Sequence, residues 1–527
     1  GESPLPCAQD IHVRKRRVAA HGKGYDPAMT DALPASTTLP SREICFRAMA
    51  AKDHRFDGLF FIAVRSTGIY CRPVCPAPPP KRQNISFFAN AAAATAAGYR
   101  PCLRCRPELS PDAFALVRED AVRRALALIA EGALQDGSAD ALATRVGLSA
   151  RQLQRVFRTH VGATPHTVHA TRRLLLAKQL LTETALPATD VALAAGYNSL
   201  RRFNAAFKDG CGMPPGAIRR KASAAKAPSG ILALRLGYRP PLDFPLLLAF
   251  LAKRAIPGIE RVNADSYERA VGPGRAWLRV SAVKGRPELK LEIGEADPHS
   301  IHDLVRRVRR MFDLDADLRP VHALFADDPL LSRAIALHPG LRVPCCWDGF
   351  ELAVRAVLGQ QISVAGATTL ARRLVETWGE QHAGEAAQIG LDRSFPSPER
   401  LRDAPLETIG LPRTRAATLR ALSAAVVNGQ LSFEAGQRLD DFVERAVALP
   451  GIGAWTAQYI AMRALALPDA FPAGDLVLQQ RLGPGAGVAR LSERATEARS
   501  QVWRPWRAYA VLHLWHLPAP LVQENAA

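Results

Sequence analysis

Apolar side chains recur with helical spacing along most of the chain, whereas one stretch alternates as a sheet does. The helical pattern is clear in residues 140–162, at Leu142, Val146, Leu153, Val156 and Phe157. In residues 231–310 apolar and polar residues alternate, as in the run 289–293, which predicts half-buried strands. The helical spacing returns after about residue 345. The pattern predicts a multidomain protein that is mainly α with α+β parts.

The helical stretch near residue 150 occurs twice. Ser149 and Gln152 have the spacing of a capping box and open a second helix after a break at Gly147. Residues 190–207 repeat this plan with Gly196 and one extra residue in the turn. The repeat predicts two helix-turn-helix units, with an ordinary helical hairpin as the alternative. Side chains suited to a DNA groove lie at exposed positions of the second helices: Arg151, Gln152, Arg155, Arg201, Arg202 and Asn204.

Length and local composition divide the chain. Its 527 residues are enough for three or four domains. Residues 221–230 have the Ala, Ser, Pro and Gly content of a linker, and the first 40 or so residues show no sustained periodicity. We expect a flexible leader 1–42, a small α+β domain 43–113, an all-α domain of paired helix-turn-helix units 114–222, a linker 223–230, a strand-rich α+β domain 231–310 and an all-α domain 311–520.

Positive charge is concentrated in the first half. The chain has 69 Lys and Arg against 49 Asp and Glu, a net charge of +20. Residues 41–222 hold 27 basic against 13 acidic residues, whereas residues 341–520 hold 19 against 17. This surplus favours a polyanion as partner, because binding releases the counterions of the polyanion; anionic lipid and a merely solvated surface are the alternatives.

The apolar pattern also predicts whether the chain spans a membrane or is secreted. No run of about 18 apolar residues appears, so we expect no membrane span. The start of the sequence lacks an apolar signal core, which argues against secretion. We expect a cytoplasmic, bacterial protein that associates with the nucleoid. The nine cysteines are then expected to be reduced.

Four of the cysteines form two close pairs. Three residues separate Cys71 from Cys75 and two separate Cys102 from Cys105. Two thiol pairs of this spacing in a reduced protein are typical of a tetrahedral zinc site. The spacing predicts zinc and leaves open whether the site is architectural or takes part in chemistry.

The residues around these cysteines resemble a known family. The runs 56–75, 84–88 and 98–105 are similar to the zinc domain of the Ada adaptive-response proteins, over about residues 43–110. The resemblance implies that Cys71 is a zinc ligand and also the nucleophile that accepts a methyl group from a methyl phosphotriester in DNA. Metal binding keeps a thiol in its nucleophilic thiolate form. Methylation then removes one negative charge from the site and reduces its repulsion from DNA.

The paired helical units resemble a second family. Together with the run 210–215 they are similar to the double helix-turn-helix of AraC-type activators. The resemblance implies a transcription activator that binds successive major-groove segments of double-stranded DNA as a monomer, with RNA polymerase as a further partner.

A glycine pair lies between two helical stretches near residue 450. Gly451 and Gly453 predict a turn whose backbone N–H groups bind an anion without side-chain charge. Asp475 lies twenty residues beyond Trp455, in a loop before a helix. Aromatic residues gather in this last stretch: Trp455, Tyr459, Trp503, Trp506 and Trp515. Each alone is more typical of a core, but grouped around one carboxylate they suit a pocket for a flipped base.

Residues 231–520 resemble the helix-hairpin-helix DNA glycosylases, most closely the AlkA type of 3-methyladenine glycosylase. The resemblance rests on the runs 237–241, 347–351, 358–360, 449–457 and 503–510, and on Asp475. It implies that Asp475 is catalytic, that Trp455, Tyr459 and Trp515 line the base pocket, and that Gly451, Gly453, Gln360 and Gln361 contact DNA. Trp455 stands where strand-cleaving relatives have a Schiff-base lysine, so no lyase activity is expected. Gln361 and Leu476 replace the usual wedge leucine and the usual aromatic residue.

Together these features predict a bifunctional protein. Residues 43–222 would be a zinc-thiolate methyl acceptor and transcription activator, joined to a monofunctional glycosylase for alkylated purines such as 3-methyladenine. The expected cofactor is zinc. A DNA-binding regulator with a structural zinc site and a non-catalytic glycosylase-like module is the alternative.

Overall fold

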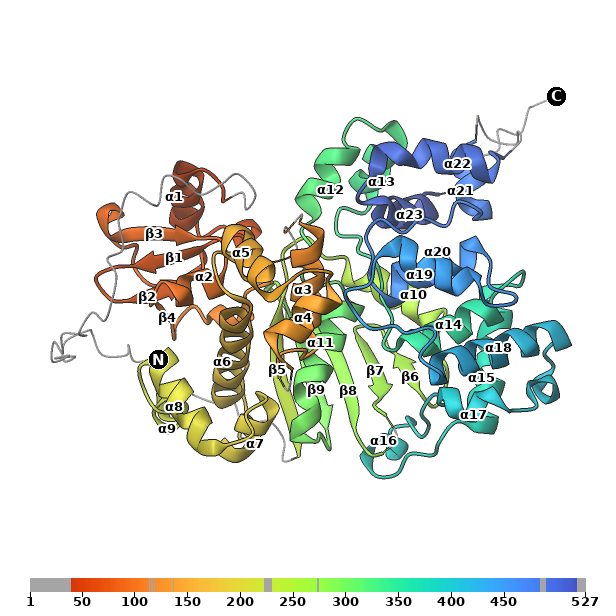
Figure 1. Ribbon diagram of the computed structural model, residues 1–527, viewed down its shortest axis with the longest axis horizontal. Coiled ribbons are helices and arrows are strands. Elements are labelled where there is room, and N and C mark those ends of the chain that lie inside the picture. The colour runs from red at the N-terminus through yellow and green to blue at the C-terminus, as the bar shows by residue number, and fades with distance from the viewer. Residues whose placement is uncertain are drawn as a thin grey trace. The chain divides into compact units, whose positions relative to one another are not determined.

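The structure is a computed structural model of the chain (Figure 1), and it describes residues 39–112, 114, 117, 119–135, 137–221, 230–272, 274–483 and 490–518. Most of the predicted leader and nearly all of the predicted linker lie outside these residues. In the part of the chain that is described, no helix combines the length and the apolar character needed to cross a membrane.

The first described segment is a small α+β unit. Its elements are α1 Arg42–Ala51, β1 Phe61–Val64, β2 Ile69–Cys71, β3 Ile85–Phe88, α2 Ala91–Ala96 and β4 Arg100–Pro101. The sheet order is β3-β1-β2-β4, with β2 and β4 parallel and the other pairs antiparallel. Ser41 caps α1 by accepting the N–H of Ile44, so regular structure begins at the end of the predicted leader.

The second segment is entirely helical. Its helices are α3 Asp120–Ala130, α4 Ala139–Arg145, α5 Ala150–Val161, α6 Pro165–Glu183, α7 Ala188–Ala194, α8 Leu200–Cys211 and α9 Pro215–Lys221. Gly147 and Gly196 lie in the two equivalent turns and have φ of 78° and 77°. Residues other than glycine rarely adopt such positive φ values. The turn before α8 is one residue longer than the turn before α5, as the sequence predicts. The paired helix-turn-helix arrangement is confirmed.

The third segment contains an antiparallel sheet of order β5-β9-β8-β7-β6. Its elements are β5 Ile231–Gly237, α10 Phe244–Ala252, β6 Glu260–Val262, β7 Ser266–Ala270, β8 Trp277–Ala282, β9 Glu288–Gly294 and α11 Ile301–Met311. Leu289, Leu291 and Ile293 are fully buried, whereas Lys290 and Glu292 between them are half-buried. The predicted alternation is therefore confirmed.

The last segment is helical. Its helices are α12 Leu318–Phe325, α13 Pro329–Leu337, α14 Gly349–Leu358, α15 Val364–Trp378, α16 Glu385–Gln388, α17 Pro398–Arg402, α18 Arg413–Val427, α19 Leu439–Val447, α20 Ala454–Ala464, α21 Leu476–Arg481, α22 Glu493–Ser500 and α23 Arg507–His516. Most of them share one apolar core, which includes Leu318 and Val321 of α12 and runs to Leu514 of α23, whereas Ala386 of α16 packs with Ala270 and Trp277 of the sheet. The boundary that we predict between residues 310 and 311 lies one residue before the end of α11, whose buried residues Ile301, Leu304, Val308 and Met311 pack in one core with the sheet.

Candidate functional site

The four paired cysteines meet at one edge of the small sheet. Cys71 is the last residue of β2, and the N–H of Cys102 donates to the carbonyl of Tyr70 at 3.0 Å, which extends the parallel pairing of β2 and β4. The four Sγ atoms all lie within 4.8 Å of one another. Four sulfur donors at this spacing fit the tetrahedral coordination that zinc prefers. Cys71, Cys75, Cys102 and Cys105 form a zinc site.

Two features distinguish the cysteines from one another. Cys102 and Cys105 are buried, at 7% and 5% exposure, whereas Cys71 and Cys75 are half-buried. The N–H of Arg72 donates to Sγ of Cys105 at 3.3 Å, and the Arg72 side chain forms a buried ion pair with Asp57. A reagent from solvent therefore reaches Cys71 or Cys75 more easily than the other two.

The side chains that we predict for DNA reading lie on the surface of α5 and α8. All six are exposed: Arg151, Gln152 and Arg155 on α5, and Arg201, Arg202 and Asn204 on α8. Gln152 has a second role, because its Oε1 accepts the N–H of Ser149 at 2.9 Å in the predicted capping box. Part of its hydrogen-bonding capacity is therefore used within the helix.

The glycine pair lies in the turn between α19 and α20. Gly451 has φ of 81°, and a Cβ there would lie 2.0 Å from Oγ1 of Thr418. A Cβ at Gly453 would meet no atom within 4 Å. Nε2 of Gln360 donates to the carbonyl of Gly451 and to Oγ1 of Thr456, both at 3.0 Å. Gly451 thus permits the close packing of the turn against Thr418, and Gly453 leaves the outer face of the turn open. The hydrogen bonds of Gln360 hold the turn in place.

Gln361 lies beside the hairpin, in the loop between α14 and α15. It is exposed and has φ of 56°, which is uncommon for a residue other than glycine. The next apolar side chain, Ile362, is 39% exposed. Ile362, which the sequence-based prediction did not include, is thus a second exposed side chain of this loop beside Gln361.

Asp475 is held by four hydrogen bonds. It caps the N-terminus of α21, where Oδ1 accepts the N–H groups of Val477 and Leu478 at 3.0 and 3.1 Å. Nε1 of Trp515 donates to the same Oδ1 and Nε1 of Trp455 donates to Oδ2, both at 3.1 Å. The carboxylate is fixed in direction, and Oδ2 accepts only one of these four bonds.

The aromatic residues that we predict for a base pocket do converge. Trp455 and Tyr459, one turn apart on α20, stack with ring centroids 5.3 Å apart and planes 10° apart. The Trp515 ring lies 6.3 Å from the Tyr459 ring. These three residues and Asp475 line one cavity of about 670 Å³, within the range of small-molecule sites. Trp503, in contrast, is 1% exposed and belongs to the core.

Two arginines that were not predicted for a site, Arg254 and Arg463, also lie in the wall of this cavity. The NH1 group of Arg463 donates to the Tyr459 hydroxyl at 2.6 Å, and the Arg254 guanidinium lies 3.7 Å from the centroid of the Phe250 ring. Burial alone would raise the pKa of Tyr459, but the two guanidinium groups outweigh it and lower that pKa below its usual value. Arg463 follows Tyr459 by one helical turn, which was the available signal; Arg254 comes from a distant part of the sequence.

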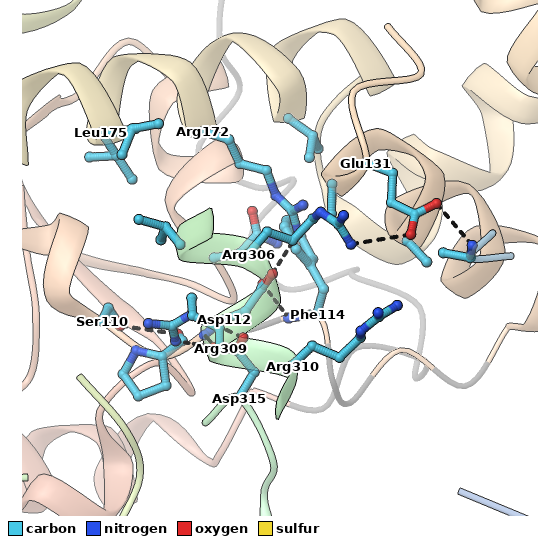
Figure 2. Close-up of a pocket in the computed structure, with 18 of the residues that line it drawn as sticks. Ser110, Asp112, Phe114, Glu131, Arg172, Leu175, Arg306, Arg309, Arg310 and Asp315 are labelled. Atoms are coloured by element: carbon cyan, nitrogen blue, oxygen red, sulfur yellow. Dashed lines mark hydrogen bonds and ion pairs between the residues drawn. The ribbon is translucent and has the colours of Figure 1, made fainter. Parts of the chain in front are cut away.

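A second cavity, of about 470 Å³, lies where α3, α6 and α11 meet (Figure 2). Three of its arginines face carboxylates: Arg172 pairs with Asp112, Arg306 with Glu131, and Arg309 with Asp315. Paired charges of this kind hold elements together and leave little net charge for a ligand. None of the residues that we predict for a site lines this cavity.

The fold and these sites define a class of DNA-binding protein that joins a zinc–cysteine unit and two helix-turn-helix units to a helix-hairpin-helix domain. Models of known families match four parts of the chain: the metal binding domain of Ada at 44–108, a helix-turn-helix domain at 142–221, the AlkA N-terminal domain at 233–348, and the HhH-GPD superfamily of base excision DNA repair proteins at 354–507. The helix-turn-helix domain and the base excision repair domain support double-stranded DNA as a partner.

Curated relatives cover nearly the whole chain. A Mycobacterium tuberculosis protein described as a probable bifunctional transcriptional activator/DNA repair enzyme AlkA is 40% identical over 486 residues, which is 90% of this chain and 96% of the relative. The Escherichia coli DNA-3-methyladenine glycosylase 2 is 33% identical over 53% of this chain and 96% of its own length. The Escherichia coli bifunctional activator Ada is 41% identical over 23% of this chain and 33% of its own length. This chain belongs to the family of bifunctional transcriptional activator/DNA repair enzymes of AlkA type.

Proposed function

We propose that the helical C-terminal part hydrolyses the N-glycosidic bond of alkylated purines such as 3-methyladenine, with Asp475 as the catalytic carboxylate. The observation that carries this proposal is the position of Asp475 at an aromatic cavity, with two indole N–H groups fixing its direction. The cavity is large enough for a purine, and Trp455, Tyr459 and Trp515 supply ring faces for stacking.

The geometry suggests how the carboxylate acts. As the bond between C1′ and the base nitrogen breaks, positive charge develops on the sugar, and a fixed carboxylate stabilises it without having to reorient. Oδ2 of Asp475 accepts only the bond from Trp455 among the described donors, so this oxygen keeps lone-pair capacity for the sugar or for the attacking water. Trp455 offers no amine for a Schiff base, so the proposed reaction ends at an abasic site.

A comparison of two aspartates tests this assignment. Asp475→Asn keeps the size of the side chain and removes its charge, and we expect release of methylated purines from duplex DNA to fall about 100- to 1,000-fold. Asp403→Asn alters a carboxylate that is 75% exposed and should release bases at the wild-type rate. Equal release by Asp475→Asn and wild type would refute the catalytic role. No release by any of the three would favour a regulator with a non-catalytic module.

We further propose that Cys71 accepts a methyl group from a methyl phosphotriester in DNA. The thiolate forms a new S–C bond, the C–O bond to the phosphotriester breaks, and the leaving group is an ordinary phosphodiester anion. Cys71 is one of the two half-buried ligands, and it lies in the most basic part of the chain. Loss of one negative charge from the zinc site would strengthen binding to promoter DNA, and recruitment of RNA polymerase by the helix-turn-helix units would follow.

Peptide mass spectrometry after incubation with methylated duplex tests the methyl acceptor. We expect one methyl group on Cys71 and none on Cys75, which is the internal control because it is also half-buried and also a zinc ligand. Methylation of Cys75 instead, or of neither cysteine, would reduce the zinc site to a structural role.

A further inference from the structure

The zinc unit, residues 42–112, contacts the sheet of the third segment through one buried arginine. Arg239 follows β5 and is 2% exposed. Its Nε donates to the carbonyl of Asp57 at 3.0 Å, and its NH2 group donates to the carbonyl of Asp112 at 2.6 Å. Its NH1 group donates to the carbonyl of Asp315, beyond α11, at 2.7 Å. One guanidinium group therefore joins the zinc unit to the part of the chain that carries the sheet.

The two parts also fit closely around Arg239. A Cβ at Gly237, the last residue of β5, would lie 1.9 Å from the carbonyl oxygen of Leu109, so glycine permits this close approach. The N–H of Asp112 donates to Oδ1 of Asp315 at 2.7 Å, and both residues are labelled in Figure 2. This amide hydrogen bond crosses the contact, so it breaks when the two parts separate.

The positive charge of Arg239 is stabilised by the groups around it and not by a paired carboxylate. Among the described residues Arg239 forms no ion pair, and its hydrogen-bond acceptors are carbonyl groups. Burial lowers the pKa of Arg239, whereas the nearby carboxylates of Asp317, Asp315 and Asp57 act against this effect. The stability of the contact therefore depends on the negative charge that surrounds Arg239.

Asp57 connects Arg239 to the zinc site. Its carboxylate accepts a hydrogen bond from Nε of Arg72 at 2.9 Å, and Arg72 is the residue after Cys71. The NH1 group of Arg72 donates to the carbonyl of Cys105 at 3.0 Å. Arg72, Asp57 and Arg239 are at most 6% exposed. A change of charge at the cysteines acts strongly on such a buried chain of contacts, because little solvent screens it.

We infer that the negative charge of the four-thiolate site stabilises the contact of Arg239 with the zinc unit, so that methylation of Cys71 loosens the zinc unit from the sheet. The inference rests on the proposed methyl acceptor. Four thiolates carry more charge than one divalent zinc ion neutralises, and conversion of one thiolate to a thioether, in the reaction proposed above, halves the excess. The attraction on the buried Arg239 then falls, whereas an Arg239 side chain in water is little affected. Methylation therefore shifts the equilibrium toward the separated state.

The opposite side of the zinc unit does not depend on the site in the same way. Its contacts with α6 contain ion pairs of their own, Glu108 with Lys178 and Arg106 with Glu183. Each of these charges has an opposite charge in direct contact, so the charge of the zinc site adds little to their stability. The zinc unit that has reacted is thus loosened on the side of the sheet, while it keeps its contact with the helical second segment.

Hydrogen exchange of the full-length protein tests the inference at the amide of Asp112. The wild type is measured before reaction with methylated duplex, and again after reaction and removal of the DNA. Cys71→Ser removes one thiolate without any methyl transfer. We expect the methylated protein and Cys71→Ser to exchange this amide about 3- to 10-fold faster than the unmethylated wild type, while peptides of β1 and β9 keep their rates.

Two arginine variants show whether Arg239 carries the effect. Arg239→Met removes the charge and should speed exchange at Asp112 before methylation, with less than about 2-fold further change after it. Arg507→Met is the matched control, because Arg507 is also 2% exposed but pairs with Asp469 and Glu497 in the helical last segment. Its response to methylation at Asp112 should equal that of the wild type.

The outcomes separate this inference from the proposed methyl transfer. If the wild type gains no methyl group but Cys71→Ser exchanges the Asp112 amide faster, the methyl acceptor fails and the link between site charge and the contact stands. If mass spectrometry finds methylated Cys71 and exchange at Asp112 is unchanged, the link is refuted. A full response in Arg239→Met, or equal acceleration in β1, would also refute it, since the effect would then come from another contact or from unfolding of the zinc unit. No methyl group and no change in Cys71→Ser would refute both.

Discussion

In the proposed function the zinc site and the cavity of Asp475 both act on damaged DNA, but the two regions of the chain differ in net charge. The zinc site lies in residues 41–222, where 27 basic residues face 13 acidic ones, while residues 341–520 around the base pocket are almost neutral. We propose that the first region is attracted to phosphates over a long range and that its thiolate is consumed by the reaction with the methyl group. On the same proposal the second region binds DNA through a hairpin backbone and stacking rings, and its carboxylate is regenerated. One part of the chain would then react once as a sensor, and the other would turn over as an enzyme.

The largest expected effect on the rate of base excision comes from the two indole N–H groups that donate to Asp475. Oδ2 depends on the bond from Trp455, whereas Oδ1 keeps two backbone donors when Trp515 is changed. We therefore expect Trp455→Phe to slow excision of 7-methylguanine about 10- to 100-fold and Trp515→Phe about 3- to 10-fold. Single-turnover rates check this order. A larger loss for Trp515→Phe would mean that stacking, and not the direction of Asp475, limits the rate.

A smaller effect tests the hairpin as a backbone anion site. In Gly453→Ala the added Cβ would contact no neighbouring atom, and the φ of −90° is ordinary for alanine, so the stability of the protein should be unchanged. The affinity for undamaged duplex should fall about 3- to 10-fold, because the methyl group stands on the face that would bind phosphate. Gly451→Ala is the matched variant: its Cβ would clash with Thr418, so the melting temperature should fall by several degrees. Calorimetry measures the melting temperature of each variant, and DNA titration measures its affinity for duplex. Unchanged DNA affinity in Gly453→Ala would remove the hairpin from the interface.

The smallest effect is on the salt dependence of DNA binding by the full-length protein. Replacing both Arg201 and Arg202 by Gln should lower the slope of log K against log salt by about 2, because each phosphate contact contributes about 0.9. Gly453→Ala should weaken binding with no change in slope, since it alters a neutral contact. If both variants change the slope of log K against log salt equally, the two regions do not differ in how strongly their binding depends on the phosphate charge of DNA.

The sequence predicted the elements whose signals are local. Capping at Ser149, the glycine turns at Gly147 and Gly196, and the cysteine spacing all depend on residues a few positions apart, and the fold agrees with them. The predicted boundary between residues 310 and 311 lies at the end of α11, whose apolar face packs with the sheet.

The lining of the cavity of Asp475 was predicted only in part, because some of its residues come from distant parts of the sequence. Trp455 and Tyr459 share one face of α20, so their meeting follows from helical spacing. Arg254 comes from the turn after α10, about 200 residues earlier, and reads in the sequence as an ordinary surface charge. Only tertiary packing brings it to the cavity of Asp475. The pairing of Glu351 with Arg269 across two segments was unpredictable in the same way.

The most direct test of two separate chemistries in one chain follows both products from a single methylated duplex. The wild type, Asp475→Asn and Cys71→Ser are each incubated with it, and free methylated purine and protein-bound methyl are measured together. We predict that Asp475→Asn stops base release but still gains a methyl group, and that Cys71→Ser gains none but still releases bases. Loss of both products from either single variant would contradict the account.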